Sequence, residues 1–301
     1  MAATATEYHD PADVDEALDL LSRLGSEATV LAGGQDVVRE MNRGERAPSN
    51  IVDVSGLPGL DGIEDEGDAL SIGSLVSHQE LAGSDLVADG APLLVDAKDT
   101  IGGGQQVHNA GTVGGALCAG QPVYDYPPCL VALEATIVAR SSDGTREIPA
   151  RNFFEGATVT ALADDELLTS VSVLKVDGAT SYEKLQYSEA CYNVASAAAL
   201  VDLDGGEVVD ARLALGGIEA SPRRLEEAEE RAAGEAFGEA LASTVGDMAT
   251  EAVENPRSDV HADGEYRRDM AGVVTKRAMT DAANRARATA DGGTDQTVGS
   301  Q

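Results

Sequence analysis

The sequence is poor in aromatic and basic residues. It has no Trp and only three Phe among 301 residues, so its cores must consist mainly of aliphatic side chains. Lys and Arg together number 21 against 53 Asp and Glu, which gives a net charge of −32. Such a chain repels nucleic acid and anionic membranes, which argues against partners of either kind. The excess of acidic residues favours a halophilic protein, because high salt screens the self-repulsion.

Cysteine is also scarce. Cys118, Cys129 and Cys191 are odd in number and show no CxxC spacing, which is typical of a reducing compartment. An iron–sulfur cluster normally needs four thiolates, and the four His form no HxxxH pair, so we expect no metal in this chain. The sequence shows no basic segment followed by an apolar segment, as in a secretory signal peptide, and no apolar run that is long enough to span a membrane. We therefore expect a cytoplasmic protein with no membrane insertion.

Glycine, by contrast, is concentrated between Thr100 and Asp125, in the stretch TIGGGQQVHNAGTVGGALCAGQPVYD. Glycine can take positive φ angles and lets a ligand approach the backbone closely. Ordering so flexible a segment costs entropy, which a bound ligand can offset. Backbone N–H groups in turns bind phosphate, and Thr112 adds a hydroxyl donor. The stretch predicts either a site for a phosphate-containing cofactor or a glycine-rich loop without a ligand.

A second glycine turn lies earlier in the chain, in the segment TVLAGGQDVV that starts at Thr29. Its pattern predicts the end of a buried strand at Val30–Leu31, a turn at Gly33–Gly34 and a short helix from Val37 onward. It has neither the GxGxxG spacing of a Rossmann fold nor the GK[ST] of a P-loop. Together, the two turns predict that a pyrophosphate is held from two sides.

The ordered set of motifs resembles the FAD-binding (medium) subunit of the molybdenum hydroxylase family, which includes the carbon monoxide dehydrogenase medium chain and the xanthine dehydrogenase flavin domain. The motifs that carry the resemblance are Ala32-Gly33-Gly34-x-Asp36, Ile101-Gly102, Gln106-Val107-x-Asn109, Gly111-Thr112-Val113-Gly114-Gly115 and Pro122-x-x-Asp125. The resemblance continues almost to the C-terminus. His108 is a departure, because many relatives have Arg there, and fewer positive side chains then face the phosphates.

The resemblance implies an α+β protein. Its FAD-binding fold would be two-lobed, of the vanillyl-alcohol-oxidase / p-cresol-methylhydroxylase type, and a C-terminal domain of antiparallel sheet plus helices would follow. We predict the FAD-binding domain over residues 1–176, with a small lobe at 1–55 and a larger lobe at 56–176. The C-terminal domain would span 177–280, and 281–301 would be a disordered tail.

The C-terminal part also has its own local pattern. Strands are predicted at 180–186, 194–202 and 208–216, with turn residues between the last two, as in an antiparallel meander. Ser221 and Pro222 are typical of a helix start, which predicts a helix from there to Ala232. A second helix is predicted from about Glu235 to Val253, and a third is predicted to begin at Gly264 and to end near Thr280.

The resemblance implies a cofactor-binding set that includes both glycine turns, one strand leucine, one aspartate and one lysine, and no catalytic or metal-binding residue. Its members are Val30, Leu31, Ala32, Gly33, Gly34, Gln35, Asp36, Val37, Ile101, Gly102, Gly111, Thr112, Val113, Gly114, Gly115, Asp125, Leu168 and Lys184. Asp125 would accept hydrogen bonds from ribose or ribityl hydroxyls. Lys184 would place a positive charge beside the flavin.

Four of these residues have simpler interpretations. A carboxylate beside a pyrophosphate is unfavourable, so we interpret Asp36 as the N-cap of the helix that begins at Val37. Asp125 could likewise cap the helix that follows it. Leu168 could be an ordinary core residue, and Lys184 a solvated strand lysine.

The resemblance implies an oxidoreductase subunit that carries FAD and transfers electrons within a dehydrogenase complex. Substrate would be oxidised at molybdopterin in a large partner, and electrons would pass through iron–sulfur clusters in a small partner to this chain and then to an external acceptor. The alternatives are a stand-alone flavin oxidoreductase and a non-redox nucleotide-binding or assembly protein on the same fold. Substrate and acceptor are not encoded in any motif of this chain.

Overall fold

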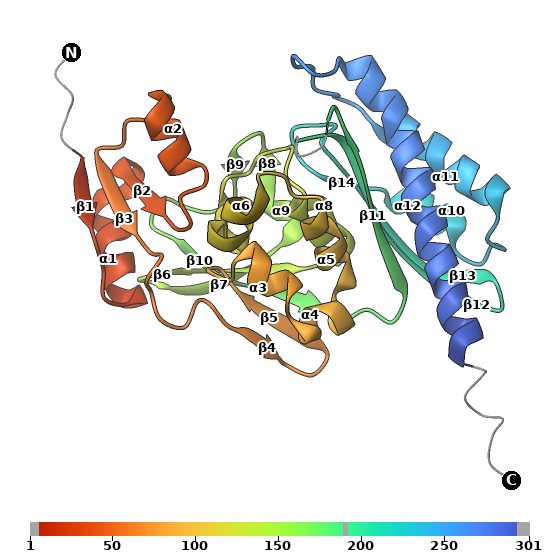
Figure 1. The fold of residues 1–301 in the computed structure, drawn as a ribbon, viewed down its shortest axis with the longest axis horizontal. Helices are drawn as coiled ribbons and strands as arrows, with labels where there is room; N and C mark the ends of the chain where they lie inside the picture. Colours follow the sequence, from red (N-terminus) through yellow and green to blue (C-terminus); the bar gives the residue numbers. More distant parts are fainter. Residues whose placement is uncertain (1–5, 189–191, 294–301) are drawn as a thin grey trace, which may run out of the picture.

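A computed structural model describes residues 6–188 and 192–293. The small lobe is a three-stranded parallel sheet in the order β1-β3-β2, and it forms one end of the molecule (Figure 1). Its elements are β1 (Glu7–His9), α1 (Val14–Leu24), β2 (Ala28–Leu31), α2 (Val37–Arg43) and β3 (Asn50–Asp53). One face of α1 is apolar, and its buried residues form a separate core with β3.

The larger lobe is built on an antiparallel sheet in the order β4-β5-β10-β6-β7. Its strands are β4 (Ile63–Asp65), β5 (Ala69–Gly73), β6 (Thr136–Ser141), β7 (Gly144–Pro149) and β10 (Leu167–Leu174), with a short hairpin of β8 (Phe154–Gly156) and β9 (Val159–Thr160). Its helices are α3 (His78–Ala82), α4 (Asp85–Gly90), α5 (Pro92–Asp99), α6 (Gly104–Ala110), α7 (Val113–Cys118), α8 (Tyr126–Ala132) and α9 (Ala150–Phe153). Most of the aliphatic core predicted from the composition lies here.

The C-terminal part is an antiparallel sheet in the order β11-β12-β13-β14, with three helices on its outer face (Figure 1). The strands are β11 (Ala179–Gln186), β12 (Asn193–Asp204), β13 (Glu207–Gly216) and β14 (Arg223–Arg224), and the helices are α10 (Glu226–Ala232), α11 (Glu239–Ala252) and α12 (Gly264–Gly293). The predicted meander is confirmed and gains a fourth strand.

The central strand β12 is buried on both faces, which is why its sequence is so rich in small apolar residues. Ala198 and Leu200 belong to the core of the larger lobe, against which α5 and α8 pack. Ala197 and Ala199 alternate with them and join the core under α11 and α12. The inner face of the C-terminal sheet is therefore continuous with the core of the larger lobe.

The structure corrects the predicted start of the first C-terminal helix. Pro222 does not begin a helix, because Arg223 and Arg224 pair with Leu215 and Ala214 as strand β14. The helix α10 starts only at Glu226. Pairing with the edge of β13 has overridden the local signal of Ser221 and Pro222.

The prediction of a disordered tail from residue 281 is wrong for residues 281–293. The helix α12 does not end near Thr280 but continues to Gly293. Ala282 and Ala283 are fully buried in the core of the C-terminal part, and Arg285 pairs with Asp96 of the larger lobe. The short apolar side chains of this helical turn continue the apolar face of α12, which the polar overall composition of the segment does not indicate. Residues 294–301 lie outside the described residues.

Candidate functional site

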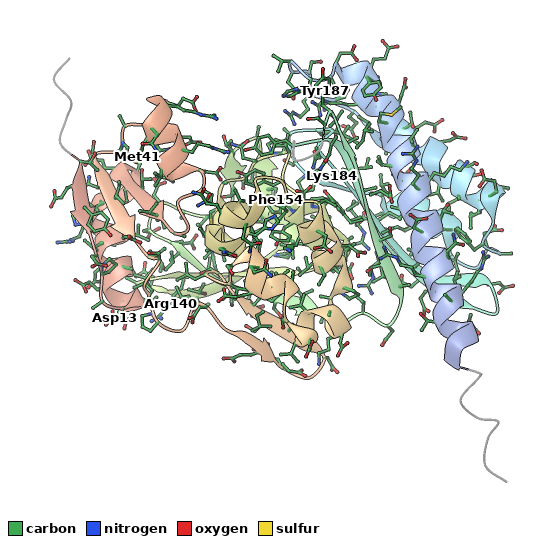
Figure 2. The ribbon with its side chains drawn as sticks, in the orientation of Figure 1. Asp13, Met41, Arg140, Phe154, Lys184 and Tyr187 are labelled. Carbon is green, nitrogen blue, oxygen red and sulfur yellow. The ribbon has the colours of Figure 1, made fainter. Side chains whose placement is uncertain are left out.

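A cavity of about 880 Å³ lies where the small lobe, the larger lobe and the C-terminal sheet meet. This volume is within the range of pockets that hold a cofactor. The small lobe contributes the turn after β2, the larger lobe contributes the glycine stretch around α6 and α7, and β11 contributes Lys184. In Figure 2, Lys184 lies on the C-terminal sheet where this sheet meets the larger lobe, and it is one of the residues that line the cavity.

The two glycine turns touch each other at Gly33. A Cβ atom at this position would lie 1.6 Å from the backbone oxygen of Ala110, just before Gly111. Gly34 follows with a φ angle of 69°, which favours glycine. Glycine is therefore required here for backbone-to-backbone contact between the two turns, which places both turns at one cavity.

The second turn begins α7 and packs closely on the sheet. Thr112 is the N-cap, and its hydroxyl accepts a hydrogen bond from the N–H of Gly115 at 3.0 Å. This leaves the O–H of Thr112 free to donate to a ligand. A Cβ atom on Gly114 would lie 2.6 Å from that of Ser74, so a side chain at residue 114 would force the turn and Ser74 apart.

Asp125 and Lys184 form a buried ion pair on the cavity wall. The Lys184 ammonium lies 3.0 Å from Oδ2 of Asp125 and 3.0 Å from the carbonyl oxygen of Thr100, and its side chain is only 3% exposed. The hydroxyl of Tyr182 donates to Oδ1 of Asp125 at 2.8 Å. Burial raises the pKa of the Asp125 carboxyl, and Lys184 and Tyr182 oppose that increase. The interpretation of Lys184 as a solvated residue is wrong, and Asp125 stands at the N-cap position of α8 without making a capping hydrogen bond through its side chain.

Asp36 also has a role that the sequence did not predict. It occupies the N-cap position of α2, yet its side chain makes no capping hydrogen bond. Its carboxylate accepts the hydroxyl of Tyr124 and pairs with Arg39 at 2.7 Å. Tyr124 in turn stacks on Tyr192, with ring centroids 6.0 Å apart. Asp36 therefore stands at the predicted N-cap position but does not cap the helix with its side chain, and its carboxylate links the small lobe to the larger lobe at the cavity.

His78 lies buried beneath the second glycine turn. Its Nδ1 is 3.2 Å from the hydroxyl of Tyr126, and its Nε2 would lie 2.7 Å from a Cβ atom at Gly111. Burial, followed by the positive charges of His108 and Lys98, lowers the pKa of His78 to about 4. The ring is therefore neutral at physiological pH, and the wall of the cavity carries no positive charge at this point.

All but two residues of the predicted set line this one cavity. The predicted residues that line the cavity are Val30, Ala32, Gly33, Gly34, Gln35, Asp36, Val37, Ile101, Gly102, Gly111, Thr112, Gly114, Gly115, Asp125, Leu168 and Lys184. Leu31 and Val113 are not on the cavity surface, and Val113 belongs to the core of the larger lobe. Leu168 is both buried and part of the lining, so its two interpretations are compatible.

Sequence reasoning missed His78 and Tyr182, and it did not predict the contact of Tyr124 with Asp36. Only Tyr182 had a usable signal, because residues i and i+2 of a strand share a face and Lys184 is two residues later. His108, which occupies a position that is often Arg in relatives, does not line the cavity. Its Nε2 lies 2.9 Å from the carbonyl oxygen of Ile101.

The residues around the cavity fit FAD. Two glycine turns present backbone where a Cβ atom would collide, Thr112 offers a hydroxyl, and Lys184 offers a positive charge on a buried wall. Within the described residues, no three His, Cys, Asp or Glu side chains are grouped so that they could hold a metal ion. In the same part of the chain, no helix is both long and apolar enough to cross a membrane.

Two protein families match the chain in sequence. Residues 4–173 match the family described as FAD binding domain in molybdopterin dehydrogenase. Residues 180–282 match the carbon monoxide dehydrogenase flavoprotein C-terminal domain.

Individual relatives match over nearly the whole chain. The carbon monoxide dehydrogenase medium chain of Hydrogenophaga pseudoflava is 34% identical, over 91% of this chain and 95% of the relative. The glyceraldehyde dehydrogenase medium chain of Sulfolobus acidocaldarius is also 34% identical, over 84% and 90%. A putative xanthine dehydrogenase FAD-binding subunit of Escherichia coli is 28% identical, over 91% and 95%.

Solved structures agree with the sequence matches. A chain of carbon monoxide dehydrogenase from Hydrogenophaga pseudoflava superposes with a TM-score of 0.89 at 34% identity, covering 95% of this chain and 99% of that one. A chain of quinoline 2-oxidoreductase from Pseudomonas putida 86 superposes equally well, at 0.89 and 30% identity, with the same coverage. The predicted family and fold are confirmed. This chain belongs to the FAD-binding medium subunits of the molybdenum hydroxylases.

Proposed function

We propose that this chain holds FAD in the cavity between its lobes and transfers electrons to an external acceptor. The electrons would come from iron–sulfur clusters of a small partner subunit, after substrate oxidation at molybdopterin in a large partner. The observation that carries the proposal is the contact between the two glycine turns at Gly33 and Ala110, on a cavity that Lys184 also lines. FAD, when bound, supplies the redox chemistry.

The residues of this chain would position the cofactor. The backbone N–H groups of both glycine turns and the hydroxyl of Thr112 would bind the pyrophosphate. Lys184 would donate to the flavin ring and favour electron uptake through its positive charge. Asp125 has a protein donor on each carboxylate oxygen. We therefore propose that its main role is to orient Lys184, and that binding a hydroxyl of the cofactor is secondary.

Partner subunits are part of the proposal. The medium-chain and subunit names of the relatives support a multi-subunit complex. The lack of a metal-binding group among the described residues is consistent with clusters located in another chain. Because the net charge is −32, we further propose that the complex works in a high-salt cytoplasm.

The test is an absorbance spectrum of the protein purified in molar potassium chloride, followed by identification of the nucleotide released on heating. We expect a flavin spectrum, near-stoichiometric FAD and co-purifying large and small subunits. Reduction by NADH with dye as acceptor, without partners, would favour the stand-alone oxidoreductase. A colourless protein that binds ADP or ATP and cannot be reconstituted with FAD would favour the nucleotide-binding alternative.

A further inference from the structure

We propose that Tyr182 is a positioning residue that sets, through Asp125, how much of the positive charge of Lys184 reaches the cofactor. The inference rests on the proposed function. Tyr182 and Lys184 lie two residues apart on β11 and therefore on the same face of the strand. Both bind the same carboxylate, Tyr182 at Oδ1 and Lys184 at Oδ2.

The geometry leaves part of Lys184 available. A lysine ammonium has three N–H donors, and two are taken by the carbonyl of Thr100 and by Oδ2 of Asp125, each at 3.0 Å. Because Lys184 lines the cavity, its third donor is available to a ligand there. The charge that this ligand experiences depends on how strongly Asp125 neutralises the ammonium.

Tyr182 weakens that neutralisation. Its hydroxyl, itself buried, draws the negative charge of Asp125 toward Oδ1 and away from the lysine. Because these side chains are buried, a charge-assisted hydrogen bond has a larger effect here than it has in water. Without the hydroxyl, the carboxylate would interact more strongly with Lys184, and the cofactor would experience less positive charge.

The first test compares Tyr182→Phe with wild type by the midpoint potential of the bound flavin, at pH 8 and saturating FAD. A high pH is chosen because burial raises the pKa of the Asp125 carboxyl, and raising the pH favours its ionised form. We expect the ratio of the binding constants of reduced and oxidised FAD to fall roughly tenfold, which corresponds to about −30 mV for a two-electron couple. An unchanged or more positive potential would overturn the inference.

Tyr8→Phe is a matched control. Tyr8 also donates to an aspartate, Asp53, but this hydroxyl is at the surface, and neither residue lines the cavity. The control should leave the potential unchanged. An equal shift in both variants would show a general effect of losing a Tyr–Asp hydrogen bond, and it would overturn the specific role of Tyr182.

A double-mutant cycle then separates an effect through Asp125 from a structural one. Asp125→Asn alone should shift the potential in the positive direction, because Lys184 loses its negative partner. In that background, Tyr182→Phe should produce no further shift. An undiminished shift would show that Tyr182 acts without Asp125. If Asp125→Asn does not fold, Lys184→Gln supplies the background, and an undiminished shift there would show that Tyr182 acts without Lys184.

Failure of the inference and failure of the proposed function give different results. Wild-type protein that cannot be loaded with FAD would refute both, because no flavin would be present to be tuned. Flavin-loaded wild type with the same potential as Tyr182→Phe would refute only the inference. Urea unfolding of both apoproteins accompanies each comparison, so that a shift caused by a damaged fold is recognised.

Discussion

The hydroxyl of Tyr124 lies 2.7 and 2.6 Å from the two carboxylate oxygens of Asp36, although 88 residues separate them in the sequence. This contact links the turn after β2 to the segment before α8. Burial and the negative charge of Asp36 raise the pKa of Tyr124, so its hydroxyl remains a donor over the whole physiological range. The small lobe is thus attached to the larger lobe at the cavity by a charge-assisted hydrogen bond.

We expect Tyr124→Phe to lower the free energy of unfolding by about 1–2 kcal/mol, because Asp36 loses a donor at a partly buried position. Tyr266→Phe, at an exposed tyrosine on α12, should change it by less than about 0.5 kcal/mol. Urea unfolding of both variants provides the measurement. Equal stability of Tyr124→Phe and wild type would show that the contact contributes nothing.

We expect Gly33→Ala to abolish FAD binding or to prevent folding, because the new Cβ atom would lie 1.6 Å from the oxygen of Ala110. The backbone of one turn would have to move away from the other. Gly56→Ala is the matched control, since no atom lies within 4 Å of a Cβ atom there and its φ angle is not positive. Flavin content after purification distinguishes the two. Full flavin content in Gly33→Ala would contradict the packing of the turns.

His78 makes stability depend on pH. Its pKa is about 4 in the folded protein and about 6.5 when unfolded, so the unfolded state binds more protons between these values. Stability from this residue is fully present above pH 6.5 and is lost as the pH falls toward 4. We expect the advantage of wild type over His78→Asn to shrink by about 3 kcal/mol across this window. Urea titrations at several pH values measure it, and a constant difference would contradict the buried neutral ring.

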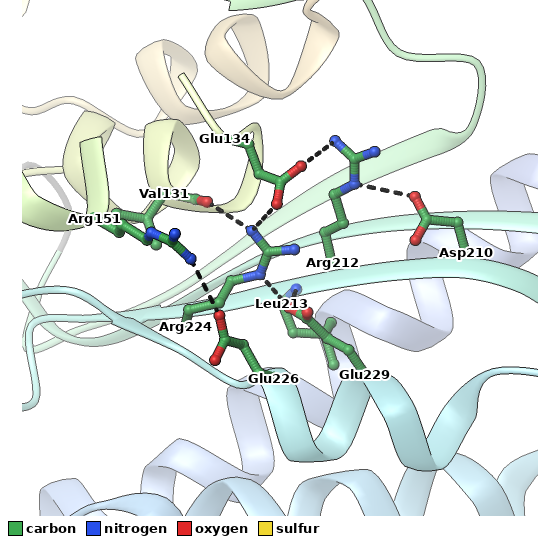
Figure 3. Close-up of polar contacts among 9 residues, drawn as sticks. All are labelled: Val131, Glu134, Arg151, Asp210, Arg212, Leu213, Arg224, Glu226 and Glu229. Carbon is green, nitrogen blue, oxygen red and sulfur yellow. Dashed lines mark hydrogen bonds and ion pairs between the residues drawn. The ribbon is translucent and has the colours of Figure 1, made fainter. Parts of the chain in front are cut away.

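Two arginines, Arg224 of the C-terminal sheet and Arg151 of α9 in the larger lobe, make polar contacts between these two parts, and the contacts differ in burial (Figure 3). Arg224 is 14% exposed, donates to the carbonyl of Val131 at 3.0 Å and pairs with Glu229. The other contact, Arg151 with Glu226, is 3.4 Å long, and both side chains are about two-thirds exposed.

We expect Arg224→Met to lower the free energy of unfolding by about 2–4 kcal/mol, because it leaves the buried Glu229 without its partner. Arg151→Met should cost less than about 0.5 kcal/mol, because solvent screens that pair. Denaturation in low and in molar potassium chloride provides the comparison. Similar losses for the two variants would show that burial does not decide the strength of these contacts.

Local sequence determined the glycine turns, the order of the motifs and the meander of the C-terminal sheet. Each of these depends on a few neighbouring residues, such as Gly33 and Gly34 after a short strand, which is half-buried and not buried as predicted, or the alternation along β12. The same kind of local signal failed where a strand that is distant in the sequence pairs with the segment. Pro222 is one example, because the edge of β13 binds the residues that follow it.

Only the tertiary structure decided the bonding partners of the three charged site residues. Asp36 binds a tyrosine 88 residues away, and Asp125 binds Tyr182 and Lys184 at separations of 57 and 59 residues. A carboxylate in a sequence has the same capping propensity whether or not such donors are near it. Burial and the packing of separate elements select its partner, because a buried charge must be paired, and no local pattern records which distant strand will supply the donor.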